Sequence, residues 1–324
     1  MRTFVTGAAG FVGSHLAARL AKDGARVRAL VHNSALPPGL GTKVEEVRAD
    51  LLDRAALRKA MEGVEIVFHL ASALGSSRIA AREFQAVNAG GTEAVLAAAR
   101  EAGVRRIVHF SSAGVLGHVR DGIPVPESRP PAPRDVYSRT KLAGEELALA
   151  AARSGQDVVI IRPGWVYGPG DRRTFKLIRT IVRRRFVLVG RGKIRQTPVH
   201  VDDLVSGTLL CAAKGRSGEI YNLTGSEVLT VKAMAEAIAA AAGTTIPGFS
   251  LPLGPAKAAA WALAALFKPF KKEAPLNPSR LAFFVDSKPL DIAKAVHELG
   301  YAPALDFRKG IAATVEWYRE NGWL

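Results

Sequence analysis

Short apolar runs alternate with amphipathic segments along the first half of the chain. Short segments rich in Val, Ile and Phe, with the apolar pattern of strands, predict strands at 3–7, 25–31, 44–50, 64–72 and 104–112. Apolar residues at helical spacing between them predict helices at 11–24, 53–63 and about 83–102, the second with Asp53 as N-cap. This β-α-β-α order predicts an α/β fold, a Rossmann-type doubly wound parallel sheet covered by helices on both faces. Sites in such sheets lie at the carboxyl ends of the strands.

The second half keeps this rhythm at first and then loses it. A proline-rich loop at 121–135 precedes a helix, two further strands and a helix at 199–214. Thr230 is a candidate cap for the helix that Gly243 ends, and prolines then break the chain until two helices in the tail. We therefore expect a smaller, mostly helical C-terminal substrate domain. The predicted division is a dinucleotide-binding domain of residues 1–165 plus about 197–225, and a lid of residues 166–196 and 226–324.

Composition narrows the class of protein. The 324 residues are 48% hydrophobic, which suits one main domain with an appendage and excludes a disordered chain. The single cysteine, Cys211, allows no internal disulfide and no cysteine-based metal site, so we expect a buried thiol, no metal and a reducing cytoplasm. We expect neither a secretory signal nor a membrane-spanning segment.

The formal charge of +16 favours anionic partners: a phosphorylated cofactor, an acidic substrate or a membrane surface. The densest basic stretch, Arg172 to Arg195, lacks the interleaved aromatic residues of nucleic-acid binding surfaces. A solvated helical face is the favoured interpretation of this stretch, with an anion or membrane role second. Nucleic acid is not an expected partner.

The segment TGAAGFVG lies between the first strand and the first helix. Gly7 would allow the tight turn, Gly10 the approach of a pyrophosphate, and Gly13 close packing of helix on sheet. Phe11 and Val12 open the predicted helix, whose free N–H groups would face the phosphates. These five residues are the first cofactor-binding candidates.

The end of the second strand would meet the adenosine half of a dinucleotide. It carries no acidic residue to bond ribose hydroxyls, while His32, with its polar neighbours, could receive a 2′-phosphate. NADP is therefore favoured over NAD, although His32 could equally be an exposed loop residue. Asp50 and Leu51 follow the third strand and are placed to meet the adenine; a helix cap is the alternative for Asp50.

Tyr137 and Lys141 are four residues apart on a predicted helix and so share one face. A free tyrosine has a pKa near ~10 and is a weak base at neutral pH. A neighbouring ammonium and an oxidised nicotinamide would both favour the phenolate. Ser112 ends a predicted strand, where its hydroxyl could bond the same substrate oxygen. We expect these three residues to be catalytic.

In this order, the motifs resemble those of extended short-chain dehydrogenases/reductases, the superfamily that holds sugar-nucleotide epimerases and dehydratases, 3β-hydroxysteroid dehydrogenases and dihydroflavonol reductases. The resemblance covers nearly the whole chain and rests on TGAAGFVG, HLAS at 69–72, NAGGT at 88–92, SSAGVLG at 111–117, YSRTK at 137–141, RPGWVYGPGD at 162–171 and VHVDDLV at 199–205. It implies that Tyr137 is the acid/base, Lys141 its partner and ribose ligand, and Ser112 the hydroxyl-binding serine. It also implies cofactor contacts from Leu70, Ala71, Ser72, Asn88, Pro163 and Val166.

Two departures bear on the substrate. Sugar-nucleotide members of this superfamily usually carry asparagine where this chain has Trp165, and an arginine and an acid where it has Gln196 and Thr197. We therefore take Trp165 and Gln196 as substrate candidates and expect a reductase or dehydrogenase for a ketone/secondary alcohol pair on a lipid- or sterol-like molecule. A structural tryptophan is the alternative for Trp165. The alternative function is a sugar-nucleotide epimerase or dehydratase, and the remote one a non-catalytic dinucleotide sensor.

The run from Ala256 to Phe267 predicts a short apolar helix followed by Lys268, Lys271 and Lys272. It could lie on a membrane surface with its lysines toward lipid phosphates, or pack on the core as part of the lid. We thus expect a cytoplasmic protein with a potential membrane contact. Because relatives of this type often dimerise through the helices that carry Asn88 and Tyr137, we also expect a homodimer.

Overall fold

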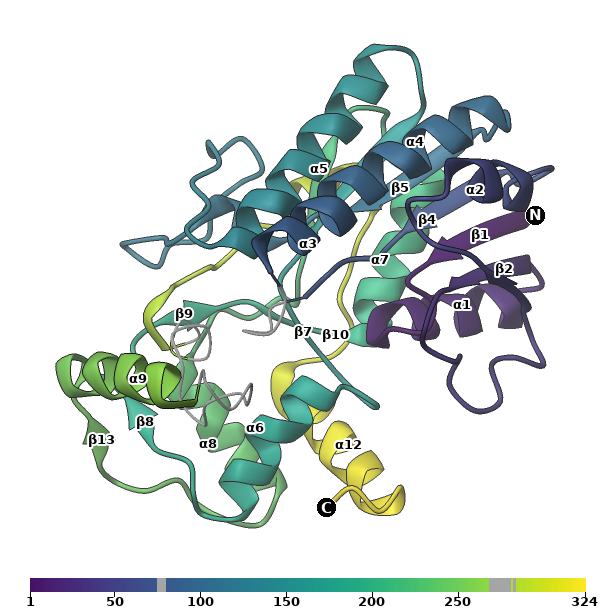
Figure 1. Ribbon diagram of the computed structural model, residues 1–324. Coiled ribbons are helices and arrows are strands. Elements are labelled where there is room, and N and C mark those ends of the chain that lie inside the picture. Colours follow the sequence, from purple (N-terminus) through teal and green to yellow (C-terminus); the bar gives the residue numbers. More distant parts are fainter. Residues whose placement is uncertain (75–79, 268–280, 282–283) are drawn as a thin grey trace.

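A seven-stranded parallel sheet organises the molecule (Figure 1). The computed structural model describes residues 1–74, 80–267, 281 and 284–324. The strand order is β11-β6-β5-β4-β1-β2-β3. The strands are β1 (Arg2–Thr6), β2 (Arg26–Val31), β3 (Glu45–Arg48), β4 (Ile66–His69), β5 (Arg106–Phe110), β6 (Val158–Pro163) and β11 (Ile220–Leu223). The order reverses between β1 and β4, which confirms the predicted doubly wound α/β fold and fixes the crevice where ligands bind such sheets.

Helices cover both faces of this sheet because its central strands are apolar on both sides. On one face α2 (Arg54–Ala60), α4 (Gly91–Glu101) and α5 (Val136–Arg153) pack over residues such as Val67 and Ile107. On the other face α1 (Phe11–Lys22) and α7 (Val201–Lys214) pack over Phe68 and Val108. Cys211 is buried in this second layer, as expected. Figure 1 shows the two layers above and below the sheet.

The structure confirms two predicted helix N-caps, Asp53 and Thr230. Asp53 accepts a hydrogen bond from the Ala56 N–H at the start of α2, and Thr230 accepts one from Ala233 at the start of α8 (Val231–Ala241). The helix expected at about 83–102 is interrupted: α3 (Ala81–Gln85) passes through a π-helical turn, Ala86–Gly90, into α4. Such turns insert one extra residue and often occur at functional sites.

A second lobe stands beside the carboxyl edge of the sheet. Its core gathers apolar side chains of α6 (Arg172–Val182), α8 and α12 (Phe307–Glu320) around Tyr167 and Tyr318. Three two-stranded sheets lie outside the large sheet: β7 (Trp165–Tyr167) with β10 (Pro198–His200), β9 (Arg195–Gln196) with β12 (Leu229–Thr230), and β8 (Leu188–Val189) with β13 (Ser250–Leu251). The apolar helix α9 (Leu253–Phe267) follows β13. Lys268, Lys271 and Lys272 lie outside the described residues.

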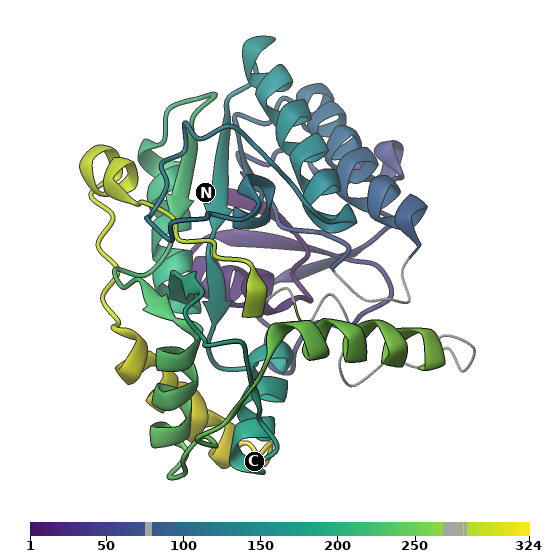
Figure 2. The same cartoon turned by 90° about the vertical axis from the view of Figure 1, so that its left-hand side faces the viewer.

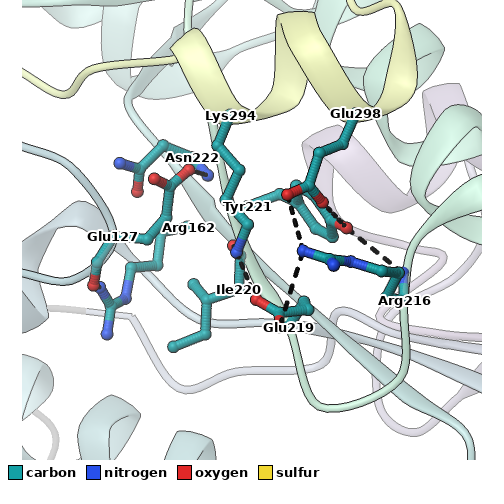
Figure 3. A network of polar contacts seen from close by, with 9 residues as sticks. All are labelled: Glu127, Arg162, Arg216, Glu219, Ile220, Tyr221, Asn222, Lys294 and Glu298. Carbon is teal, nitrogen blue, oxygen red and sulfur yellow. Dashed lines mark hydrogen bonds and ion pairs between the residues drawn. The ribbon is translucent and has the colours of Figure 1, made fainter.

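Helix α11 (Ala293–Leu299) packs on the nucleotide-binding side, although the division expected from the sequence places it in the lid. Ala295 and Leu299 are buried in the same core as α7. Figure 3 shows how polar contacts attach the helix to the edge of the sheet. Lys294 donates to the Glu219 carboxylate at 2.6 Å and to the Ile220 carbonyl oxygen at 2.7 Å, and Glu298 accepts from the Tyr221 hydroxyl at 2.8 Å.

Candidate active site

The glycine turn after β1 is shaped for close backbone approach. Gly7 has a φ of +72°, and a Cβ there would lie 2.8 Å from the Ala71 nitrogen. A Cβ on Gly13 would lie 2.1 Å from the Gly7 carbonyl oxygen, so α1 can pack here only because residue 13 is glycine. The N-cap Gly10 supplies no side-chain cap to α1, which leaves the N–H groups that begin at Phe11 and Val12 available to an anion. This geometry fits a dinucleotide pyrophosphate.

The predicted adenosine end has mixed charge. His32 follows β2 and lies 3.7 Å from the Asp50 carboxylate, the two side chains being more than half exposed. Asp50 also accepts a hydrogen bond from the Leu52 N–H at 2.9 Å, while the Leu51 side chain packs against Gly91. Arg48 donates to the His32 carbonyl oxygen at 2.9 Å and to the Glu46 carboxylate at 2.6 Å, which places a guanidinium at this corner.

The carboxyl ends of β4 and β5 bring two serines to Tyr137. Ser112 follows β5 and caps the short 3-10 helix Ala113–Leu116 by accepting from the Gly114 N–H at 3.1 Å. Asp135 caps α5 through the Ser138 N–H at 2.7 Å and so fixes the turn that carries Tyr137. Burial raises the pKa of the Tyr137 phenol, whereas hydrogen bonds with Ser112 and Ser72 lower it. The sequence placed Ser112 beside Tyr137, and the structure adds Ser72.

Lys141 lies one helical turn after Tyr137 and is 3% exposed. Its ammonium donates a hydrogen bond to the carbonyl oxygen of Phe110, the last residue of β5. Burial lowers the pKa of Lys141 to about 8, and the negative charge of Glu145 acts in the opposite direction. The lysine is therefore held by the backbone of β5 and by a carboxylate one turn further along α5.

Asn88 ties three segments together from the π-helical turn. Its side-chain oxygen accepts from the Ala73 N–H at 2.7 Å and from the Ser72 hydroxyl at 3.0 Å. Its amide nitrogen donates to the Thr140 hydroxyl on α5 at 2.9 Å. The side chain thus links the end of β4 to α5, the helix that carries Tyr137. Asn88 lies within the π-helical turn, Ala86–Gly90, which contains one extra residue.

A buried ion pair supports the far side of α5. Arg162 on β6 binds both carboxylate oxygens of Glu145, at 3.0 and 2.5 Å, and the Ser111 hydroxyl donates to the same carboxylate at 2.5 Å. Glu145 is 1% exposed and Arg162 is 2% exposed. This cluster connects the end of β5, β6 and α5. Ser111 directly precedes Ser112, and Glu145 lies one helical turn after Lys141.

The predicted nicotinamide and substrate residues come from the turns after β4 and β6 and from β9. Leu70 and Val166 pack at the border of the core that also contacts Phe11 and Val12, and Pro163 ends β6. Trp165 is half-buried; its ring stacks on Tyr167 at 5.8 Å and lies 6.3 Å from Phe307. The Gln196 amide donates to the Asp286 carbonyl oxygen at 2.8 Å, so it already holds a neighbouring segment.

Three residues near the site were missed by sequence reasoning. Arg173 was assigned to a solvated helical face, yet its charge lowers the pKa of Tyr137, which places the start of α6 near the phenol. Glu145 carries a weak signal, as an acid spaced one turn beyond Lys141. Arg48 alternates with acids on a predicted strand and gives no signal of its own. Among the described residues, no group of three or more His, Cys, Asp or Glu side chains is arranged for a metal ion.

Comparisons with known proteins agree with this geometry. The model of the NAD dependent epimerase/dehydratase family matches residues 3–224. The 4-hydroxy-2-methyl-3-oxo-4-farnesyl-3,4-dihydroquinoline-1-oxide ketoreductase of Stigmatella aurantiaca is 34% identical over 97% of this chain and 95% of its own length. The sterol demethylase protein B of Methylococcus capsulatus is 32% identical over the full length of both chains. The crystal structure of dTDP-glucose 4,6-dehydratase from Streptomyces venezuelae with NAD bound superposes with a TM-score of 0.80, at 30% identity, over 100% of this chain and 98% of that one.

Proposed function

The chain belongs to the NAD dependent epimerase/dehydratase family of extended short-chain dehydrogenases/reductases, NAD(P)-dependent oxidoreductases, and we propose that it interconverts a ketone and a secondary alcohol on a hydrophobic substrate. The substrate would enter between the sheet edge and the second lobe. In this proposal residues 1–165 and 197–225 hold the dinucleotide, and the lid comes from 166–196 and 226–324, except that α11 packs with the first part.

We assign the proton chemistry to Tyr137, oriented by its hydrogen bonds with Ser112 and Ser72. The Tyr137 hydroxyl would donate a proton to the carbonyl oxygen in reduction and accept one from the alcohol in oxidation. Ser112 would bond the same oxygen, and Lys141 would hold the ribose hydroxyls. When bound, the nicotinamide supplies or accepts the hydride. Gly7, Gly10 and Gly13 would admit its pyrophosphate, with Leu70, Ala71, Pro163 and Val166 along its nicotinamide half.

The half-buried Trp165, which stacks on the buried core residue Tyr167 and lies beside Phe307, is the observation that carries the hydrophobic assignment. Position 196 holds a glutamine, so no arginine or acid is present there to bind a nucleotide diphosphate. The Gln196 amide instead donates a hydrogen bond to the Asp286 carbonyl oxygen. The similarity to a ketoreductase named for a farnesylated substrate, and to a sterol demethylase component, supports the same choice.

The test is to incubate the protein with NADPH or NADH and a panel of hydrophobic ketones, and to follow cofactor oxidation. We expect turnover with at least one ketone, reduced by about 10²–10⁴-fold in Tyr137→Phe, the range that general acid–base catalysis contributes. Tyr221→Phe is a suitable control because Tyr221 lies at the edge strand β11. Inactivity on all ketones, together with turnover of a UDP- or dTDP-sugar, would reject the proposal.

A sugar-nucleotide epimerase or dehydratase is the second candidate, favoured by the whole-chain superposition on dTDP-glucose 4,6-dehydratase. Enzymes of that kind recycle their nicotinamide within one turnover, so the cofactor would remain bound through purification with no net redox change. Exchange of cofactor in each turnover would exclude this candidate.

We also propose a homodimer through the α4–α5 face. Half of the residues that line a shallow groove there are small: Ala86, Ala89, Gly90 and Ala143. Small side chains allow helices of two subunits to approach closely. Light scattering should give twice the chain mass, and Ala86→Arg or Ala143→Arg, at partly exposed positions, should give the mass of a single chain. A monomer in the unsubstituted protein would refute the dimer.

A further inference from the structure

Helix α9 exposes apolar side chains to an unusual degree. Its fifteen residues include one charged residue, Lys257, and only Ala256 and Ala260 are buried. Those two alanines pack in a small cluster with Val189 and Leu281, which is a narrow contact for a helix of this length. Figures 1 and 2 show α9 along the outside of the second lobe, extending past the rest of the protein in the turned view.

The helical period places the two buried alanines, with Leu263 and Phe267, on one side, and Trp261 and Leu266 on the other. At 100° per residue, Trp261, Ala265, Ala258, Ala262 and Leu266 follow one another around the outer side of α9. Trp261 is 69% exposed and Leu266 is 62% exposed, and Phe249, just before β13, is 65% exposed. A surface helix ordinarily presents charged residues outward. Here the outward face is apolar along its length, which marks an interaction surface.

Strong positive charge lies next to this face. Residues 166–196 contain ten lysines and arginines and one acid, more than half of the net charge of the whole chain. The exposed residues Arg183, Arg184 and Arg185 precede β8, which pairs in parallel with β13, the strand that leads into α9. The parallel pairing sets these arginines at the same end as Phe249. Arg191 and Lys193, which are also exposed, follow β8 at the other end of the pair, where Leu251 leads into α9 and accepts a hydrogen bond from the Gly190 N–H. Cations therefore lie at both ends of the strand pair, and two of them lie at the end from which the apolar helix begins.

We propose that α9 and the basic residues beside the β8–β13 pair, among them Arg191 and Lys193, dock this protein on an anionic lipid surface. An amphipathic segment lying in the interface buries its apolar face about 5–10 Å deep while its cations meet lipid phosphates. Tryptophan is favoured at that depth, and each basic residue near an anionic surface adds to binding. A second copy of the chain is the weaker candidate for this surface, because pairing would bring the basic residues of the two copies against each other. Among the described residues no helix is long and apolar enough to cross a bilayer, so docking would be peripheral.

Vesicle flotation with the intact protein tests this proposal independently of the reaction. The probes are phosphatidylcholine vesicles with and without about one third phosphatidylglycerol, at low and high salt. We expect binding only to the anionic vesicles, weakened by salt. Trp261→Glu with Leu266→Glu should reduce it at least tenfold, and alanine at Arg191 and Lys193 by about fivefold for each basic residue. Ile123→Glu, at an exposed apolar residue on a different loop, is the matched control and should bind normally.

Each variant must retain the thermal unfolding midpoint and cofactor affinity of the parent, so that lost binding is not lost folding. Blue-shifted fluorescence on vesicle addition, absent in Trp261→Phe, would place this residue in the lipid. Failure to bind anionic vesicles at low salt would overturn the proposal, as would binding that is unaffected by the double glutamate variant. A concentration-dependent dimer that the same variant abolishes would identify a second copy as the occupant and likewise overturn it.

Discussion

The buried ion pair between Glu145 on α5 and Arg162 on β6 gives the sharpest prediction. Glu145→Ala would leave the Arg162 guanidinium buried with one remaining partner, the Glu127 carbonyl oxygen at 3.0 Å. Removing one member of a buried pair costs about 3–5 kcal/mol, because the remaining charge stays desolvated and unpaired. We expect the free energy of unfolding to fall by that amount, measured from urea unfolding at a constant m-value.

Neighbouring residues provide the controls. Glu146 follows Glu145 on α5 but is exposed, so Glu146→Ala should change the unfolding free energy by less than about 0.5 kcal/mol. Replacing both members, Glu145→Leu with Arg162→Met, should recover most of the loss, since an apolar pair of similar volume needs no charge compensation. A cost below about 1 kcal/mol for Glu145→Ala, or equal costs for the Glu145 and Glu146 variants, would refute the reasoning.

The same substitution should alter the titration of Lys141, whose pKa of about 8 reflects burial opposed by the Glu145 charge. Without that carboxylate the pKa of Lys141 falls further, so the alkaline limb of cofactor affinity should move to lower pH. Glu145→Gln tests this with less structural loss. If the alkaline limb of cofactor affinity is unchanged in a folded Glu145→Gln variant, Glu145 stabilises α5 without influencing the titration of Lys141.

Three further outcomes are expected. Gly13→Ala should abolish dinucleotide binding in fluorescence titration, because its Cβ would overlap the Gly7 carbonyl oxygen; normal affinity would contradict the turn geometry. Arg48→Ala should raise the KM for NADPH more than that for NADH, because Arg48 adds positive charge beside His32; equal effects would count against a 2′-phosphate there. The folded pKa of Lys141 lies below its unfolded value near 10.5, so its folded form binds fewer protons between about pH 8 and 10.5, and its contribution to stability should rise with pH in that window; Lys141→Met should remove this rise from urea midpoints.

The fold was predictable because local signals agreed with the global arrangement. Apolar runs of strand length, glycine at the first turn and caps such as Asp53 all favour the same parallel sheet. The π-helical turn at Asn88 was not predictable, because its cause is tertiary: the side chain bonds both the end of β4 and Thr140 on α5. Periodicity along one segment carries no information about such bonds.

The site was predictable where chain order alone fixes position. Ser112 and Tyr137 meet because parallel strands end at one edge and α5 begins there. Arg173 could not be found in this way, since its approach to Tyr137 depends on how the turn after β7 returns across the sheet edge. In the sequence it is one arginine among several of a basic run. A sequence pattern therefore does not show which charged residues reach a site from another lobe.

The electrostatics of Tyr137 differ from the simplest expectation. We expected the Lys141 ammonium to lower the pKa of the phenol, but the lowering comes from hydrogen bonds with Ser112 and Ser72 and from the charge of Arg173, and burial outweighs them. With protein groups alone, Tyr137 is protonated at neutral pH, which suits it to donate a proton to a ketone. To accept a proton it needs a further positive charge beside the ring, which an oxidised nicotinamide supplies and a reduced one does not. In the proposed reaction the same tyrosine would therefore act as an acid for reduction and as a base for oxidation.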